Sequence, residues 1–112
     1  MAAKGMTGKL VVLVTCASRA QARKIARAVV GKRLAACVNI AAGRVESVYR
    51  WKGKVERAQE VLLVIKTTRA RYAALQREVR RLHSYTTPEV IALPIAAGSK
   101  AYLDWVAENS RA

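Results

Sequence analysis

The sequence predicts a single-domain α+β fold, with helices packed on one sheet. Strand-like and helix-like segments follow one another in the order strand, helix, strand, strand, helix, strand. The two halves also look alike, since LVVLVT, a helix and VNIAAG correspond to LLVIKT, a helix and LPIAAG. With 112 residues, 53% of them hydrophobic and 25% charged, the chain can bury one core. We expect one domain at residues 9–108, with flexible ends at 1–8 and 109–112.

The first half opens with a strand and a helix. Residues 10–15 form a continuous, β-branched run, which is typical of a buried strand. Ser18 is the expected N-cap of a helix whose apolar residues recur at helical spacing, and Gly31 is expected to supply its left-handed stop. Residues 35–40 return to an extended, buried pattern, which predicts the second strand.

A long hairpin is predicted in the middle of the chain. After Gly43, residues 45–51 alternate between two faces, so the second strand is long or bent. Lys52 and Gly53 suit a two-residue turn, because the glycine accepts the positive φ that such a turn requires. A long third strand follows, with its buried part at residues 60–67.

The second half ends with a helix, a strand and a short terminal helix. Thr68 is the expected start of the second helix. Its apolar stripe comprises Tyr72, Leu75, Val79 and Leu82. Residues 88–95 predict the last strand, and Ser99 begins the terminal helix. This order of elements is the split βαβ, or ferredoxin-like, sandwich, here with a long β-hairpin and a short C-terminal helix.

The charge balance is unusual, with 21 Lys and Arg against seven Asp and Glu, a net charge of +14. Nine basic residues precede the first acid, Glu46. Basic side chains also occupy the first turns of both main helices, where the helix dipole favours acids, so helix stability does not account for them. Three interpretations follow: a solvated basic surface, a surface that binds polyanions, or a scaffold whose surface acids were replaced.

The chain has no apolar run long enough to span a membrane, and its start lacks the apolar core of a signal peptide. We therefore expect a cytoplasmic protein. Cys16 and Cys37 lie in apolar runs and are expected to be reduced. The helices carry ordinary core stripes without a Trp- or Phe-rich interfacial face, so membrane association is not predicted.

Tyr49 and Trp51 of the hairpin point to the same face of their strand. Exposing two large aromatic side chains together is costly, and an isolated hairpin is only marginally stable in water. We therefore expect a partner subunit to cover them in a closed symmetric oligomer. The alternative is that they fold back on their own core.

Several ordered blocks of the chain resemble one known family. They are VLVTC (residues 12–16), KRLAACVNI (32–40), SVYRWKGKV (47–55), EVLLVIKTT (60–68), PEVIALPI (88–95) and AYLDWV (101–106). Together they resemble the CutA family, which is linked by name to divalent-cation tolerance. The resemblance implies a ferredoxin-like fold in a tight homotrimer, in which the long hairpin reaches a neighbouring subunit.

The resemblance also implies a copper-binding cluster at Cys16, His83 and Glu89. Thiolate and imidazole are ligands that copper takes up readily, and a carboxylate can complete a partial shell. The family commonly has His-Pro-Tyr followed by an acid, whereas His83 is followed here by Ser-Tyr-Thr. The basic surface also repels metal ions. We therefore expect weak copper binding by a surface-modified, positively charged variant of the scaffold.

The sequence also bears on two other classes of function, enzymes and nucleic-acid-binding proteins. His83 is the sole histidine of the sequence, and no glycine-rich phosphate loop or Ser, His, Asp set can be proposed, so we expect no enzyme activity. The chain has no Phe and no aromatic pattern on the central strands for base stacking, so sequence-specific nucleic-acid binding is not predicted. The alternative function is a polycationic scaffold that binds or co-assembles with anionic macromolecules, either acidic protein or nucleic acid.

Overall fold

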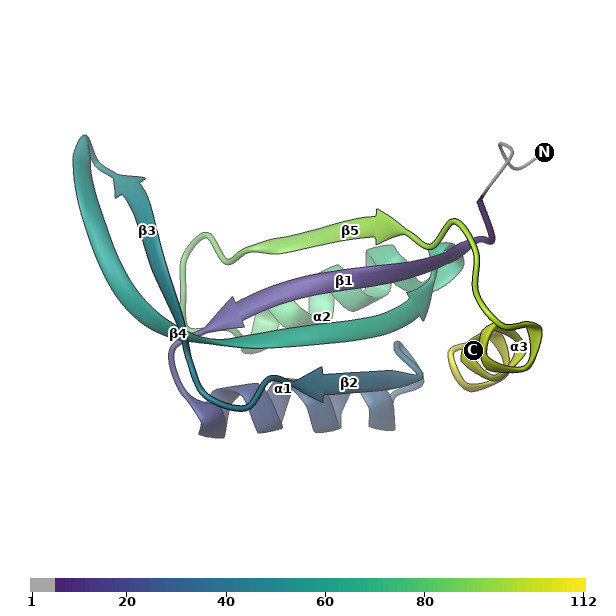
Figure 1. Ribbon diagram of the computed structural model, residues 1–112. Coiled ribbons are helices and arrows are strands. Elements are labelled where there is room, and N and C mark those ends of the chain that lie inside the picture. Colours follow the sequence, from purple (N-terminus) through teal and green to yellow (C-terminus); the bar gives the residue numbers. More distant parts are fainter. Residues whose placement is uncertain (1–5) are drawn as a thin grey trace.

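Helices cover one face of a five-stranded antiparallel sheet in the computed structural model, which describes residues 6–112 (Figure 1). The strand order is β2-β4-β1-β5, and β3 pairs with the first half of β4. The strands are β1 (Lys9–Cys16), β2 (Cys37–Ile40), β3 (Val45–Trp51), β4 (Lys54–Thr68) and β5 (Val90–Pro94). The helices are α1 (Arg19–Gly31), α2 (Tyr72–Leu82) and α3 (Lys100–Asn109). The predicted α+β, ferredoxin-like fold is confirmed.

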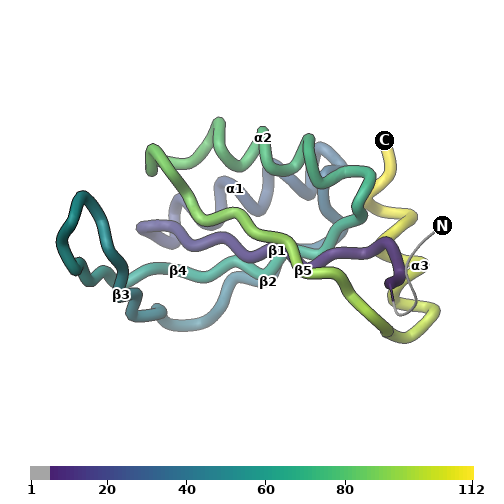
Figure 2. Tube along the Cα trace, turned by 90° about the horizontal axis from the view of Figure 1, so that it is seen from above, coloured from purple at the N-terminus to yellow at the C-terminus, as the bar shows by residue number. Residues whose placement is uncertain are grey.

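The arrangement has two layers with a projecting hairpin. Seen edge-on, α1 and α2 lie on the same side of the sheet (Figure 2). The hairpin of β3 and β4 extends beyond one end of the sheet, and α3 lies at the other end (Figure 1). Of the flexible start expected at residues 1–8, residues 1–5 lie outside the described part of the chain. Within residues 6–112, no helix combines the length and the apolar character needed to cross a membrane.

The core lies between the sheet and the two long helices. Alternate residues of the central strands face the helices, and the apolar stripes of the helices meet them. The strands contribute Leu10, Val12, Val14, Val61, Leu63 and Ile65, and the helices contribute Ala22, Ile25, Val29, Leu75 and Val79. Burying one such large aliphatic side chain stabilises the fold by roughly 1.5–3 kcal/mol. The predicted stripe of the second helix is therefore part of the core, with Tyr72 and Leu82 partly buried at its ends.

Serine side chains cap the N-termini of α1 and α3, as expected, whereas the C-terminal end of α1 differs from the expectation. Ser18 caps α1, since its side chain accepts a hydrogen bond from the Gln21 N–H, and Ser99 caps α3 in the same way. The expectation that Gly31 supplies the left-handed stop is wrong, because the left-handed residue is Arg33, with φ 59°. A Schellman motif surrounds it, closed by Leu34 N to Val29 O at 2.8 Å and Arg33 N to Val30 O at 3.0 Å.

The middle of the chain bends where the sequence predicts it. Gly43 has a positive φ of 75° between β2 and β3, so the second strand is split at this glycine. Lys52 and Gly53 both have positive φ, 51° and 79°, as the two-residue turn requires. Thr68 ends β4 and precedes a 3-10 turn, its side chain makes no capping bond, and α2 itself begins at Tyr72.

Candidate functional site

An open groove of about 790 Å³ lies where the hairpin leaves the sheet. Tyr49 and Trp51 of β3 and Glu60 of β4 line the hairpin side. The irregular segment 84–89, between α2 and β5, lines the other side, and Thr15 at the end of β1 also contributes. Because β1 and β5 are antiparallel neighbours, the last residues of β1 and the residues just before β5 meet at the same end of the strands.

Glu60 and Tyr85 face each other across this groove. Glu60 is only 7% exposed, and the Tyr85 hydroxyl donates a hydrogen bond of 2.8 Å to its carboxylate. Burial, with a further contribution from the hydrogen bond to Glu60, raises the pKa of Tyr85 to about 12. The phenol therefore keeps its proton at neutral pH and stays a donor. Within residues 6–112, no Lys or Arg forms an ion pair with Glu60.

His83 follows α2 and is 9% exposed. Its Nε2 lies 2.8 Å from the main-chain oxygen of Thr15, and the Tyr85 N–H donates to its Nδ1 over 3.0 Å. A carbonyl can only accept, so the two partners assign the imidazole proton to Nε2. Both ring nitrogens are thus engaged with the main chain, and a metal ion could bind the ring only after one of these bonds opens.

Cys16 ends β1 and is fully buried. Its Sγ lies 3.6 Å from the main-chain oxygen of Ser18 and 3.9 Å from that of Val61. Burial raises the pKa of the Cys16 thiol, and the charge of Glu60 adds to this effect. The thiol therefore stays protonated at neutral pH, whereas a metal ligand must be the thiolate.

The three predicted metal ligands lie at the same edge of the sheet. The hydrogen bond to Thr15 places His83 beside the residue that precedes Cys16, and the exposed Glu89 lines the groove together with Thr15. In the part of the chain that the structure describes, however, no three His, Cys, Asp or Glu side chains form a group that could hold a metal ion. As arranged, the ligands do not form a metal centre, because the thiol is buried and the imidazole is already bonded.

Glu60 and Tyr85 belong to the groove, although neither is among the site residues predicted from the sequence. Glu60 stands out in the sequence as an acid at the start of the buried run of β4. Tyr85 carries no comparable signal, because the irregular segment 84–89 has no periodicity that would indicate the direction of a side chain. The hydrogen bond of Tyr85 depends on how this segment packs against Glu60 of β4.

The predicted interface residues are exposed in the single chain. Tyr49 is 45% and Trp51 47% exposed, and Val48 and Val55 of the same hairpin are each 64% exposed. The alternative that the two aromatic residues fold back on their own core is therefore wrong. They form one wall of the groove instead.

Comparisons with known proteins agree on one family. Residues 10–109 match the family model described as CutA1 divalent ion tolerance protein. The chain is 53% identical over 100 residues to the divalent-cation tolerance protein CutA of Thermus thermophilus, covering 89% of this chain and 96% of that protein. It is 52% identical over 93 residues to mouse protein CutA, covering 83% of this chain but 52% of the longer mouse protein. The solved structure of the Thermus thermophilus protein superposes with a TM-score of 0.89 at 51% identity, covering 92% and 99% of the two chains.

Proposed function

Because the chain belongs to the CutA1 family of divalent ion tolerance proteins, we propose that it serves divalent-cation tolerance as a non-enzymatic, cytoplasmic homotrimer that binds copper weakly. What supports the metal part of the proposal is that His83 bonds to Thr15, the residue before Cys16, and that Glu89 lines the open groove together with Thr15. This set combines a sulfur, a nitrogen and an oxygen donor, of which the first two suit copper.

The same geometry explains why the binding is weak. The Cys16 thiol must lose its proton, although burial raises its pKa, and His83 must release Thr15 or Tyr85. Both changes oppose binding, and the net charge of +14 repels the cation. Because metal binding displaces the thiol proton, the affinity increases with pH.

The proposed trimer is supported by apolar surface that a single chain leaves uncovered. Besides the hairpin, β5 exposes Ile91 and Leu93 by 49% and 48%, and β5 is an edge strand of the sheet. An exposed apolar edge strand is a ready pairing site for another chain. In a closed three-fold arrangement, the hairpin of each copy meets a second surface of the next, so both exposed regions are covered at once.

Calorimetric titration with Cu²⁺ at pH 7.5 tests the copper site. The parent protein should bind with measurable but low affinity, and His83→Ala should bind at least about tenfold more weakly, which corresponds to about 1.4 kcal/mol. Glu89→Gln is the second variant, because Glu89 is exposed and its replacement leaves the core intact. The matched control is Glu108→Gln, which removes an acid on α3, at the other end of the sheet.

The control should bind copper like the parent, and binding by the parent should weaken from pH 7.5 to pH 6, because the Cys16 thiol retains its proton more firmly at the lower pH. Equal copper binding by the parent, by His83→Ala and by Glu89→Gln would contradict the proposed copper site. Tight binding that does not change with pH would contradict the displacement of a thiol proton.

A further inference from the structure

The two main helices and their flanking residues hold about half of the basic residues of the molecule. Residues 19–33 contain six Lys or Arg and residues 69–81 contain five, eleven of the chain's 21, but these segments hold one of its seven acids, Glu78. Five exposed cations on the outer sides of α1 and α2 define what we call the helix face: Arg23, Lys24, Arg27, Arg77 and Arg80. Both helices lie on the same side of the sheet (Figure 2), and the side chains of all five residues are exposed.

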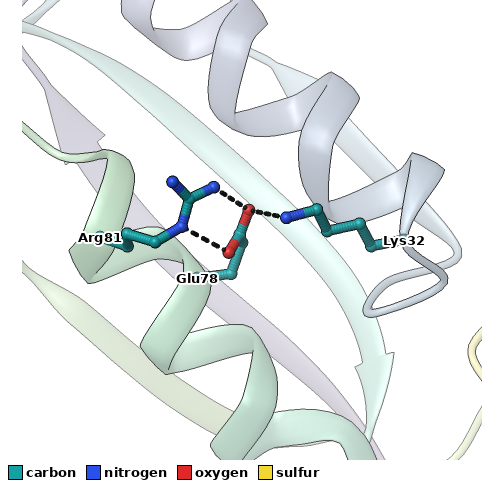
Figure 3. A network of polar contacts seen from close by, with 3 residues as sticks. All are labelled: Lys32, Glu78 and Arg81. Atoms are coloured by element: carbon teal, nitrogen blue, oxygen red, sulfur yellow. Dashed lines mark hydrogen bonds and ion pairs between the residues drawn. The ribbon is translucent and has the colours of Figure 1, made fainter.

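The acid within the helix layer does not offset these charges. Glu78 lies between the helices, its side chain is 10% exposed, and Lys32 and Arg81 donate to it over 2.8–3.0 Å (Figure 3). Two cations thus already surround one carboxylate. In residues 6–112, none of the five cations of the helix face takes part in an ion pair.

The cations of the helix face on α1 do not lie where the helix dipole favours them. The first turn of α1 contains no acid and its last turn no base, although the dipole favours acids in the first turn and bases in the last. In α2, by contrast, Arg80 lies in the last turn, where the dipole favours a cation. Arg23 and Arg27 are four residues apart on one helix, where like charges destabilise the helix. A bound polyanion would relieve this repulsion.

We propose that the helix face binds the phosphate backbone of duplex nucleic acid without sequence preference. Four of its five cations are arginines, whose planar guanidinium pairs with phosphate through two parallel hydrogen bonds. Cations four residues apart are separated by about 6 Å along a helix, and packed helices lie about 8–10 Å apart. The helix face therefore presents two rows of cations, which together cover a length of a few neighbouring phosphates.

The surroundings of the helix face favour a duplex over the other polyanions. Protein interfaces depend on aromatic and apolar anchors. In the described part of the chain, α1 and α2 expose a single large hydrophobic side chain, Val30, which is 41% exposed. Single strands bind by stacking their bases on aromatic side chains. Tyr72 of α2 is only partly exposed, and its hydroxyl bonds to the main chain of Val90. A duplex backbone requires neither anchors nor stacking, because counterion release supplies most of its affinity.

Fluorescence anisotropy with a labelled 20-base-pair DNA duplex tests the proposal. The parent should bind at 50 mM salt and weaken at least about tenfold at 200 mM, as expected when two or more phosphates are neutralised. Two duplexes of unrelated sequence should bind equally, and an RNA duplex should compete with DNA because the recognised group is the phosphate.

The variants distinguish the helix face from net charge alone. Arg23→Glu with Arg27→Glu changes the formal charge by −4, from +14 to +10, and should weaken binding at least about tenfold at 50 mM salt. Arg44→Glu with Lys54→Glu is the matched control, because it makes the same charge change on exposed residues of a loop and of the hairpin. Its affinity should stay within twofold of the parent.

Four outcomes would overturn the proposal. An equal loss in the control would show that overall charge, not the helix face, holds the nucleic acid. Tighter binding of a single strand, or binding of poly-L-glutamate as tight as that of the duplex, would overturn the assignment to a duplex backbone. The absence of binding by the folded parent at 50 mM salt would overturn it altogether. Thermal melting of each variant, followed by circular dichroism, verifies that it is folded.

Discussion

Glu78 is an acid whose ionisation the fold changes strongly. Hydrogen bonds from Arg81 and then from Lys32 lower the pKa of Glu78 to about 2, from an ordinary value of 4.5 (Figure 3). The ion pairs therefore stabilise the fold fully above about pH 4.5, and this contribution is lost as the pH falls from 4.5 towards 2. Because Lys32 and Arg81 are 55% and 61% exposed, solvent screens the pairs.

Glu78→Gln should lower the free energy of unfolding by about 1 kcal/mol at pH 7, the upper end for pairs with exposed cations. The difference in the free energy of unfolding between the variant and the parent should shrink at pH 3.5 and be small at pH 2.5. Urea titrations of the two proteins at a fixed protein concentration measure this difference at each pH. The control Glu108→Gln breaks an exposed pair with Arg111 and should cost less than about 0.5 kcal/mol. A difference that persists unchanged at pH 2.5 would contradict the role of the carboxylate charge.

The sequence predicts which residues face the core. It predicts less readily which pairs of polar side chains come into contact. Leu75 and Val79 follow from helical periodicity, and the structure buries both. Glu78 lies on the same helix, but its partner Lys32 comes from the end of another helix, and tertiary packing decides that contact. The bond of His83 to Thr15 is likewise set by two chain segments that are distant in sequence.

The hairpin turn at Lys52 and Gly53 requires positive φ at both residues. Gly53 has φ 79°, and a Cβ placed there would meet no atom within 4 Å. Gly53→Ala should therefore destabilise by about 1 kcal/mol through backbone strain and not through a clash. Gly31→Ala is the matched control, because it adds the same methyl group in open space at a residue without positive φ. The control should be neutral or stabilising, since alanine favours helix.

Lys52→Asn should act in the opposite direction, because Asn tolerates the left-handed conformation that Lys52 adopts at φ 51°. Thermal melting compares the three variants with the parent. The melting temperature of Lys52→Asn should lie above that of the parent, and the melting temperature of Gly53→Ala should lie below it. Equal melting temperatures for the two glycine variants would contradict a role for positive φ.

Element by element, the predictions succeed where a local rule decides the outcome. Ser18 and Ser99 cap their helices, and the Lys52-Gly53 turn closes the hairpin. The end of α1 is different, because the left-handed position falls on Arg33 and not on Gly31. The Arg33 side chain donates to the main-chain oxygens of Glu108 and Arg111, so contacts with the C-terminal segment accompany this choice.

Two opposing forces act on the whole molecule. Apolar surface on the hairpin and on β5 favours association, while each added subunit brings a further charge of +14. The sequence predicts both forces, since Tyr49 and Trp51 are conspicuous and the charge can be counted. It does not show that α1 and α2, with their exposed cations, pack on the same side of the sheet while the hairpin extends beyond one end of it, because this arrangement depends on tertiary packing (Figures 1 and 2).

Sedimentation velocity at 50 mM and 300 mM salt tests the proposed trimer. With apolar contacts holding subunits of 12.3 kDa, the parent should sediment as a trimer at both salt concentrations, and more tightly at 300 mM, where the charges are screened. Tyr49→Ala with Trp51→Ala should dissociate it, because these side chains supply the aromatic surface of the hairpin. The control Val30→Ser removes an exposed apolar residue of α1 and should leave the trimer intact. A monomeric parent at both salt concentrations would contradict the proposal, and a trimer that survives the double substitution would place its interface away from the hairpin.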